Sequence, residues 1–181
     1  MLWNVDKFVF CCRFGGGLWG PLLSKSGDWS LSPSKGRKRT DMLNIEDTIC
    51  APATVPGTGA IAIIRMSGRD SFSIADKVIR CKGGNISDTE GYRLKYGVAL
   101  EADGTDLDTV LVSVFRAPHS YTGEDSVEIS SHSSKYIVER LLQRLVDCGA
   151  RVAGPGEFTQ RAFVNGKMDL AQAEAVAAVT S

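Results

Sequence analysis

Two strand-length runs separated by an Asp-Gly turn constrain the fold of this chain more than any other feature. Residues 92–100 and 109–115 carry the β-branched and aromatic side chains that are typical of strands. Between them lies Asp103-Gly104, a dipeptide favoured in tight hairpin turns because both residues tolerate positive φ. A hairpin pairs its strands antiparallel, so the pattern disfavours a doubly wound parallel sheet.

The other predicted elements are strands and helices in irregular order. Short apolar runs predict three more strands, and apolar residues at helical spacing predict four helices. The strands are residues 47–51, 60–66 and 126–130, and the helices are residues 70–81, 134–148, 157–163 and 169–181. Ser133 or Ser134, and Asp169, stand where a side chain can cap a helix N-terminus. This mixture predicts an α+β fold with a mixed β-sheet and packed helices.

Residues 1–41 lack this regularity, since neither period 2 nor period 3.6 persists there. Three interpretations are open. The apolar run 8–12 suggests a signal peptide, although Arg13 ends it early. The basic cluster at 35–39 suggests a nucleic-acid patch. The abrupt change at Met42 favours the third, a non-native or disordered extension upstream of the true start.

Charge and cysteine content argue against several classes of function. Residues 1–41 hold seven basic and three acidic residues, so the remaining 14 basic and 18 acidic residues give a net charge of −4. A mildly acidic folded part is poorly suited to grip nucleic acid through its phosphates. Five cysteines without a Cys-x-x-Cys pair, and two histidines, make a zinc site unfavourable and suggest a reducing, cytoplasmic setting. No apolar run approaches the roughly 20 residues that a membrane span needs.

Two glycine-containing patterns bear on nucleotide binding. Residues 57–62 match G-x-G-x-x-A, but the run that follows has the composition of a strand, whereas a dinucleotide site requires a helix there. No G-x-x-x-x-G-K-[ST] pattern occurs in the sequence. The chain alone should therefore have no GTPase activity of the P-loop type.

Arg65 and Glu128 are candidate binding residues because each is a charge within an apolar strand run. Glu128 lies between Val127 and Ile129, so alternation places its side chain on the opposite face. A carboxylate there could accept paired N–H bonds from an amino-pyrimidinone edge. The alternative for both residues is a solvent-exposed position at the surface of the sheet.

Two further polar segments admit both a functional and a structural interpretation. His132 among serines suggests a hydrolase, but no G-x-S-x-G motif supports it. Residues 154–170 concentrate polar side chains at a Pro-Gly turn, where they often face a ligand. These side chains are Glu157, Arg161, Asn165 and Lys167. The structural alternative is an elbow with a Glu157–Arg161 pair at i,i+4.

Read together, these motifs resemble the N-terminal part of the tRNA-modification GTPase family MnmE, also called TrmE. The resemblance covers about residues 46–181. It rests on segments that follow in order: Asp47-Thr48-Ile49, Pro56-Gly57, Ile64 to Gly68, Ser120 to Asp125, Pro155 to Phe163, and Asn165 to Ala175.

The resemblance implies a fold and a cofactor that composition does not reveal. The family's N-terminal domain is similar to the tetrahydrofolate-binding domain of the glycine-cleavage T-protein. It binds 5-formyltetrahydrofolate, a one-carbon cofactor, and forms a homodimer. Carried over by position, Arg65, Glu128 and Lys167 match the residues that contact the folate. None of them is implied to be catalytic.

The resemblance also implies a larger parent protein. Residues 42–166 correspond to the folate-binding dimerisation domain, and 167–181 to the start of a truncated helical domain. A GTPase module that uses GTP, magnesium and potassium follows in the family. With the flavoprotein MnmG, such a protein modifies carbon 5 of the wobble uridine of tRNA in the cytoplasm, without membrane attachment.

One position departs from the family pattern. His132-Ser133-Ser134 stands where the family usually has His-Gly-Gly. Serine restricts the backbone more than glycine does and narrows the approach of a ligand to the backbone. The alternative function is therefore an assembly module that has lost folate binding.

Overall fold

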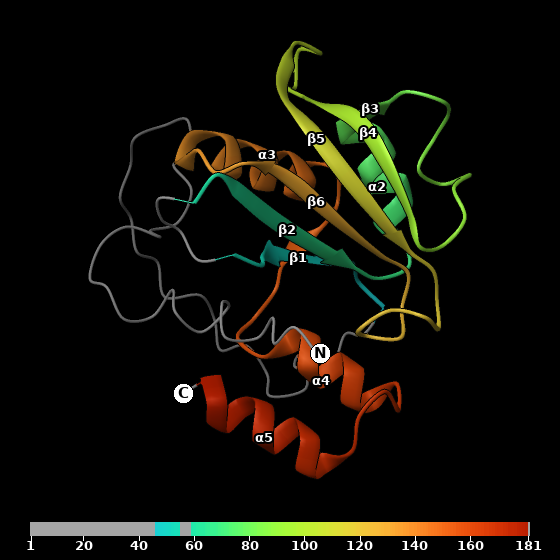
Figure 1. The fold of residues 1–181 in the computed structure, drawn as a ribbon, viewed down its shortest axis with the longest axis vertical. Helices are drawn as coiled ribbons and strands as arrows, with labels where there is room; N and C mark the ends of the chain where they lie inside the picture. The colour runs from blue at the N-terminus through green and yellow to red at the C-terminus, as the bar shows by residue number, and fades with distance from the viewer. Residues whose placement is uncertain (1–45, 55–58, 181) are drawn as a thin grey trace, which may run out of the picture.

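The computed structural model describes residues 46–54 and 59–180, which form a seven-stranded sheet with packed helices (Figure 1). The strands are β1 (Ile49–Pro52), β2 (Ile61–Ser67), β3 (Ile79–Cys81), β4 (Arg93–Leu100), β5 (Asp106–Phe115), β6 (Ser126–His132) and β7 (Arg151–Val152). The helices are α2 (Ser71–Val78), α3 (Lys135–Asp147), α4 (Glu157–Val164) and α5 (Leu170–Thr180). The predicted α+β class is confirmed. The proposed extension at residues 1–41 and the Pro56-Gly57 turn lie outside the described residues.

The predicted hairpin joins β4 to β5. Gly104 has a φ of +84°, and Oδ1 of Asp103 accepts hydrogen bonds from the backbone N–H and the hydroxyl of Thr105. These contacts explain why Asp-Gly suits the turn. Strand β5 begins at Asp106, three residues before the predicted start, because cross-strand pairing with β4 extends it through polar residues.

The strand order is β3-β4-β5-β6-β2-β1-β7, so β2 lies inside the sheet between β6 and β1. Among the described strands, β1 and β7 pair in parallel, while all other pairs are antiparallel. The sheet is therefore mixed, as predicted. The antiparallel register of β2 and β6 sets Arg65 directly opposite Glu128.

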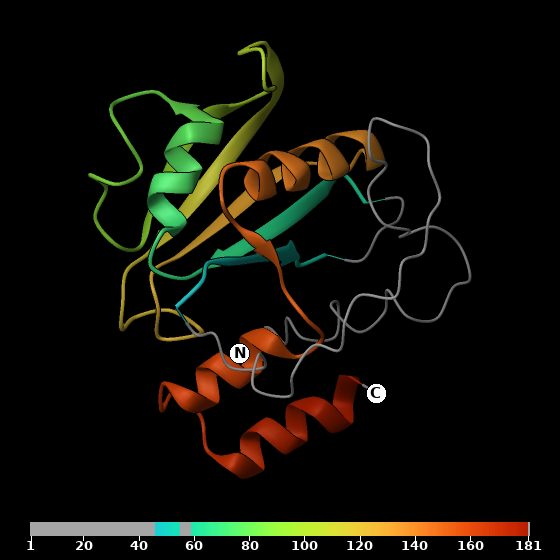
Figure 2. The ribbon, with the colours of Figure 1, turned by 180° about the vertical axis from the view of Figure 1, so that it is seen from behind.

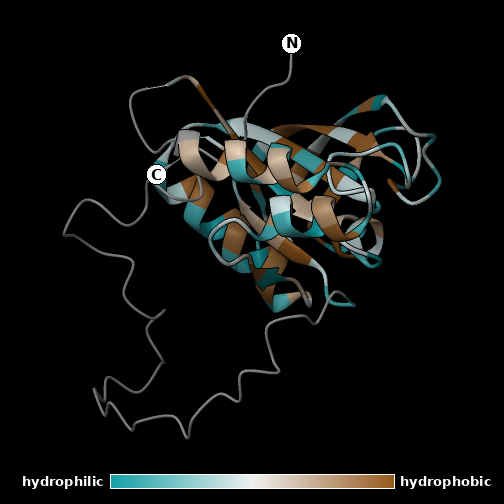
Figure 3. Cartoon of the chain, turned by 90° about the horizontal axis from the view of Figure 1, so that it is seen from below, coloured by the Kyte–Doolittle hydropathy of each residue, from teal (hydrophilic) through white to brown (hydrophobic). Residues whose placement is uncertain are grey.

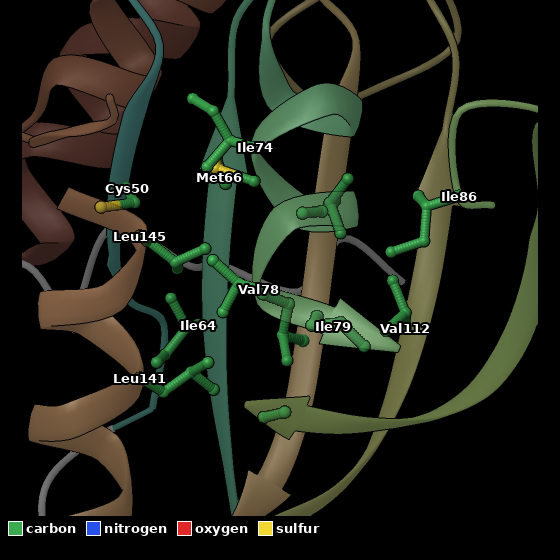
Figure 4. Close-up of a cluster of buried hydrophobic side chains, with 14 of the residues drawn as sticks. Cys50, Ile64, Met66, Ile74, Val78, Ile79, Ile86, Val112, Leu141 and Leu145 are labelled. Atoms are coloured by element: carbon green, nitrogen blue, oxygen red, sulfur yellow. The ribbon is translucent and has the colours of Figure 1, made fainter. Parts of the chain in front are cut away.

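The main core lies between the sheet and the pair α2 and α3, which pack on the same face (Figure 2). Leu141 and Leu145 of α3 are fully buried beside Ile64 of β2 (Figure 4). On β5, Val112 faces this core while Leu111 faces the opposite way and is 42% exposed. Hydrophobic and hydrophilic residues are intermixed along the helices and strands seen in Figure 3.

A smaller apolar cluster on the other face of the sheet holds α4. Strand β1 alternates between the two faces: Cys50 belongs to the main core, whereas Ile49 and Ala51 pack with Phe158 of α4. Helices α4 and α5 lie together at one end of the molecule, away from α2 and α3 (Figures 1 and 2). Helix α4 thus covers part of the face that α2 and α3 leave open.

The helix predicted over residues 70–81 is too long. Helix α2 ends at Val78, and Ile79 takes up extended backbone, with φ −125° and ψ 124°. Residues 79–81 then form β3, which pairs with β4 at Ala99. β-branched Ile79 suits a strand, and pairing outweighs the apolar spacing that predicted a longer helix. Strand β7, of two residues, carried no sequence signal.

The predicted helix caps meet different outcomes. Asp169 caps α5, since its Oδ1 accepts from the backbone N–H of Gln172 while the Gln172 side chain accepts from the Asp169 N–H. This is the reciprocal arrangement of a capping box. Ser134 occupies the N-cap of α3, but its side chain makes no capping hydrogen bond. None of the described helices is both long enough and apolar enough to cross a membrane.

Candidate functional site

Arg65 and Glu128 form an ion pair on the face of the sheet opposite the main core. Their strands place them side by side, and Nε of Arg65 donates to Oε1 of Glu128 at 2.9 Å. Nη2 of Arg65 donates to the same oxygen. The Arg65 side chain is 9% exposed and the Glu128 side chain 24%. The predicted orientation of Glu128 away from Val127 and Ile129 is confirmed, and Arg65 is a buried partner rather than an exposed surface residue.

This pair leaves hydrogen-bonding groups unused. Nη1 of Arg65 is buried and has no hydrogen-bond partner among the described residues. Both hydrogen bonds from Arg65 reach Oε1 of Glu128, and no hydrogen bond of the described chain reaches Oε2. A buried donor without a partner is costly, so the pair as it stands is incomplete. Among the described residues, one donor of Arg65 and one acceptor of Glu128, on neighbouring strands, therefore have no hydrogen bond.

Two aromatic rings pack against the Arg65 guanidinium. Its Cζ lies 5.2 Å from the ring centroid of Tyr121 and 5.9 Å from that of Phe158. Tyr121 comes from the loop between β5 and β6, residues 116–125, and Phe158 from α4. Both distances lie within the range of cation–π attraction. These aromatic contacts carried no sequence signal, because the three residues are far apart along the chain.

Lys167 contacts the same 116–125 loop. Its Nζ donates to the backbone carbonyl of Pro118 at 3.0 Å. Gly123 has a φ of +78°, and a Cβ there would lie 3.1 Å from Cγ of Lys167, so glycine lets the lysine stem cross the loop. The structure thus brings Arg65 and Glu128 into direct contact, and connects Lys167 to them through the loop.

A second ionic cluster surrounds Arg161, whose side chain is 2% exposed. Its Nη1 donates to the backbone carbonyl of Asp47 at 2.7 Å, and its guanidinium pairs with the carboxylates of Asp47, Glu124 and Glu157. Arg151 completes the cluster by bonding Asp47 at 2.6 Å and Glu157. The predicted Glu157–Arg161 pair exists, and both residues are structural rather than ligand-facing. Of the contacts in this cluster, the sequence predicted only the i,i+4 pair of Glu157 and Arg161.

Two carboxylates of this cluster, Asp47 and Glu157, have their pKa values lowered by their arginine partners. Burial raises the pKa of Asp47, but hydrogen bonds from Arg151 and Arg161 outweigh it and leave the pKa below its ordinary value of 3.8. Burial likewise raises the pKa of Glu157, while bonds from Arg151 and the Gly154 N–H lower it below 4.5 overall. Asp47 and Glu157 are therefore both ionised at neutral pH.

His132 does not form the triad that a hydrolase needs. Its Nδ1 lies 2.8 Å from Oδ1 of Asp108, and the side chain is 69% exposed. Among the described residues no serine hydroxyl hydrogen-bonds the imidazole, and Ser131 instead contacts the His132 backbone carbonyl. The described part of the chain also contains no group of three His, Cys, Asp or Glu side chains that could hold a metal ion.

Comparison with known proteins places this chain in a family. The family model described as "GTP-binding protein TrmE N-terminus" matches residues 48–167, well over half of the chain. The chain therefore belongs to the TrmE N-terminal family, and the resemblance found in the sequence is confirmed.

The relatives that share this similarity are named tRNA modification GTPase MnmE. The protein from Parabacteroides distasonis is 54% identical over 132 residues, which cover 72% of this chain and 29% of the relative. Those from Bacteroides thetaiotaomicron and Moorella thermoacetica are 53% and 52% identical over 134 residues, covering 73% of this chain and 28% and 29% of the relatives. The chain thus spans less than a third of the length of the curated relatives it matches.

Removing the buried cation should destabilise the fold strongly. We expect Arg161→Met to lower the free energy of unfolding by about 3–5 kcal/mol, because three carboxylates would lose their shared partner. Urea denaturation followed by circular dichroism measures this free energy of unfolding. Arg69→Met is the matched control: the Arg69 side chain is 82% exposed, so the change should stay within about 0.5 kcal/mol. Equal stability losses in the two variants would contradict a central role for Arg161.

The same cluster predicts the response to acid. Because the pKa values of Asp47 and Glu157 are lowered by folding, their stabilisation is complete above the unfolded values of 3.8 and 4.5. It is lost as the pH falls below them toward the lower folded values. We expect the unfolding free energy to decrease below pH 4.5, and the Asp47→Asn, Glu157→Gln double variant to show a shallower decrease. Identical pH slopes would argue against this assignment.

Proposed function

We propose that this chain is the folate-binding, dimer-forming N-terminal domain of a tRNA-modification GTPase. The observation that carries the folate part is the incomplete Arg65–Glu128 pair: a buried Nη1 donor without a partner beside a carboxylate oxygen that accepts no hydrogen bond in the described chain. Membership of the TrmE N-terminal family and the name of the relatives support the proposal that the parent protein is a tRNA-modification GTPase.

The chemistry of the pair suits the amino-pyrimidinone edge of a folate. That edge offers a carbonyl oxygen beside ring N–H and amino donors. Arg65 would donate from Nη1 to the carbonyl, and Glu128 would accept from the N–H groups through Oε2. Each side would thereby satisfy a group that the protein alone leaves incomplete. When bound, 5-formyltetrahydrofolate would supply the one-carbon group. Arg65 and Glu128 would bind and orient this cofactor.

Lys167 is the proposed contact for an anionic or carbonyl part of the same ligand. Its ammonium is exposed and donates to one backbone carbonyl, so it has further donors to offer. The glutamate tail of a folate carries the carboxylates that such a donor would bind. In this proposal residues 42–166 form the folate-binding domain and 167–181 begin the helical domain.

The activity of the whole protein is proposed from its relatives. A GTPase module would bind GTP, magnesium and potassium. The parent would act in the cytoplasm with the flavoprotein MnmG on carbon 5 of the wobble uridine of tRNA. This chain would contribute cofactor binding and assembly, without hydrolysing GTP itself.

We propose the outer face of β4 and β5 as the surface that pairs with a second copy. Leu94, Tyr96 and Leu111 are 62%, 48% and 42% exposed there, and Tyr96 lies directly opposite Leu111. Three large uncharged side chains clustered on adjacent strands are typical of an interface rather than of a solvated surface. The neighbouring Ser113 pairs with Glu128, so this face continues into the proposed folate site.

Substitution of Glu128 tests folate binding. We expect Glu128→Gln to weaken binding of 5-formyltetrahydrofolate about tenfold or more. Glutamine carries no negative charge, and its NH₂ group replaces one of the carboxylate oxygens that would accept the ligand's hydrogen bonds. Isothermal titration calorimetry on the purified chain measures the Kd. Glu139→Gln on α3, outside the site, is the control and should leave the Kd unchanged.

The alternative function gives a different result in the same experiment. An assembly module that has lost its ligand would give no binding heat with the unmodified chain. In that case the Ser133→Gly, Ser134→Gly variant, which restores the family's usual residues, should recover binding. No heat from either protein would rule out the folate proposal.

A charge on the proposed interface should separate the copies. We expect Leu111→Glu to convert a dimer to a monomer in sedimentation velocity, because burying an unpaired carboxylate at an apolar interface is costly. Tyr136→Glu is the matched control: Tyr136 is 61% exposed but lies on α3, on the opposite side of the sheet. Dissociation by Tyr136→Glu alone would place the interface elsewhere.

A further inference from the structure

The aromatic contact between Tyr121 and Arg65 gives the proposed folate site a residue that the family resemblance does not assign. We infer that Tyr121 is a positioning residue: its ring holds the Arg65 guanidinium so that Nη1 and the free oxygen of Glu128 face the same ligand edge. This inference rests on the proposed function.

The geometry shows why Arg65 needs such support. Its hydrogen bonds to Glu128 converge on one carboxylate oxygen, through Nε and Nη2. A guanidinium held through a single acceptor atom can pivot about that atom, unlike one held by two parallel bonds. The Tyr121 ring, 5.2 Å from Cζ, lies against the guanidinium and opposes this pivoting.

The Tyr121 ring is itself fixed from two directions. Its hydroxyl lies 3.1 Å from Oγ1 of Thr159 on α4, and its ring packs in the apolar cluster with Ile49 and Phe158. The loop that carries Tyr121 is anchored by the Thr122 carbonyl, which accepts from the Asn165 amide at 2.7 Å. The orientation of Arg65 is therefore set by α4 and the loop as well as by Glu128.

Tyr121→Leu and Tyr121→Phe form the discriminating pair of variants. Leucine keeps an apolar side chain in the cluster but lacks an aromatic face, whereas phenylalanine keeps the face and loses only the hydroxyl. We expect Tyr121→Leu to weaken binding of 5-formyltetrahydrofolate about 3- to 30-fold, and Tyr121→Phe to restore it to within about threefold of the unmodified chain. Equal affinities for the two variants would overturn the inference.

Two controls separate positioning from a general structural effect. If Tyr121 acts through Arg65, Tyr121→Leu should cause no further loss of affinity in an Arg65→Met background. An equal loss in both backgrounds would overturn the inference. A pterin without a glutamate tail should lose the same factor as the full folate, because the affected contacts lie at the pyrimidinone edge. A loss confined to the full folate would point to Lys167 instead.

A ligand-free measurement distinguishes failure of this inference from failure of the proposed function. The Nε–H signal of Arg65 in ¹⁵N-resolved NMR reports its hydrogen bond to Glu128. We expect Tyr121→Leu to shift this signal and speed its exchange with water, and Tyr121→Phe to leave it near the unmodified position. An unchanged signal in Tyr121→Leu would overturn the positioning role even if folate binds. A changed signal in a chain that does not bind folate would support the positioning role of Tyr121 and contradict the proposed folate binding.

Discussion

The buried guanidinium of Arg161 is the interaction on which the rest of the structure depends. It joins three segments that are far apart in sequence: Asp47 before β1, Glu124 in the 116–125 loop, and α4 itself. An isolated charge in such a place would be expensive, so the arginine and its carboxylates must be present together. The apolar cluster beneath α4 is small, and charge pairing therefore fixes where this helix and the loop lie.

The two buried arginines differ in how many of their guanidinium nitrogens are hydrogen-bonded among the described residues. Both Nη atoms of Arg161 are hydrogen-bonded, which suits a structural junction. Arg65 keeps one buried Nη without a partner, and its carboxylate Glu128 keeps one oxygen without a hydrogen bond in the described chain. The saturated cluster holds rigid the loop and helix that surround the unsaturated pair. Such a division, with a strained or incomplete site on a fully satisfied scaffold, is typical of binding sites.

Local sequence rules predicted the parts of the fold that depend on neighbouring residues. The Asp103-Gly104 turn, the buried stripe of α3 and the orientation of Glu128 all follow from periodicity or turn chemistry. Contacts between distant segments were beyond these rules. The Arg65–Glu128 pair joins residues 63 positions apart, and no spacing indicates that register. For the same reason the predicted helix 70–81 was too long, since only pairing with β4 turns its end into a strand.

The contact between Asp47 and Arg161 spans 114 residues, and it has a consequence for the order of folding during synthesis. Strand β1 leaves the ribosome well before its parallel neighbour β7 and before Arg161, the partner of Asp47. A nascent chain that lacks α4 would present Asp47 and Glu124 without Arg161, and an open edge at β1. The β1–β7 pairing and the Asp47–Arg161 contact therefore both require segments of large sequence separation to meet, a requirement that slows folding.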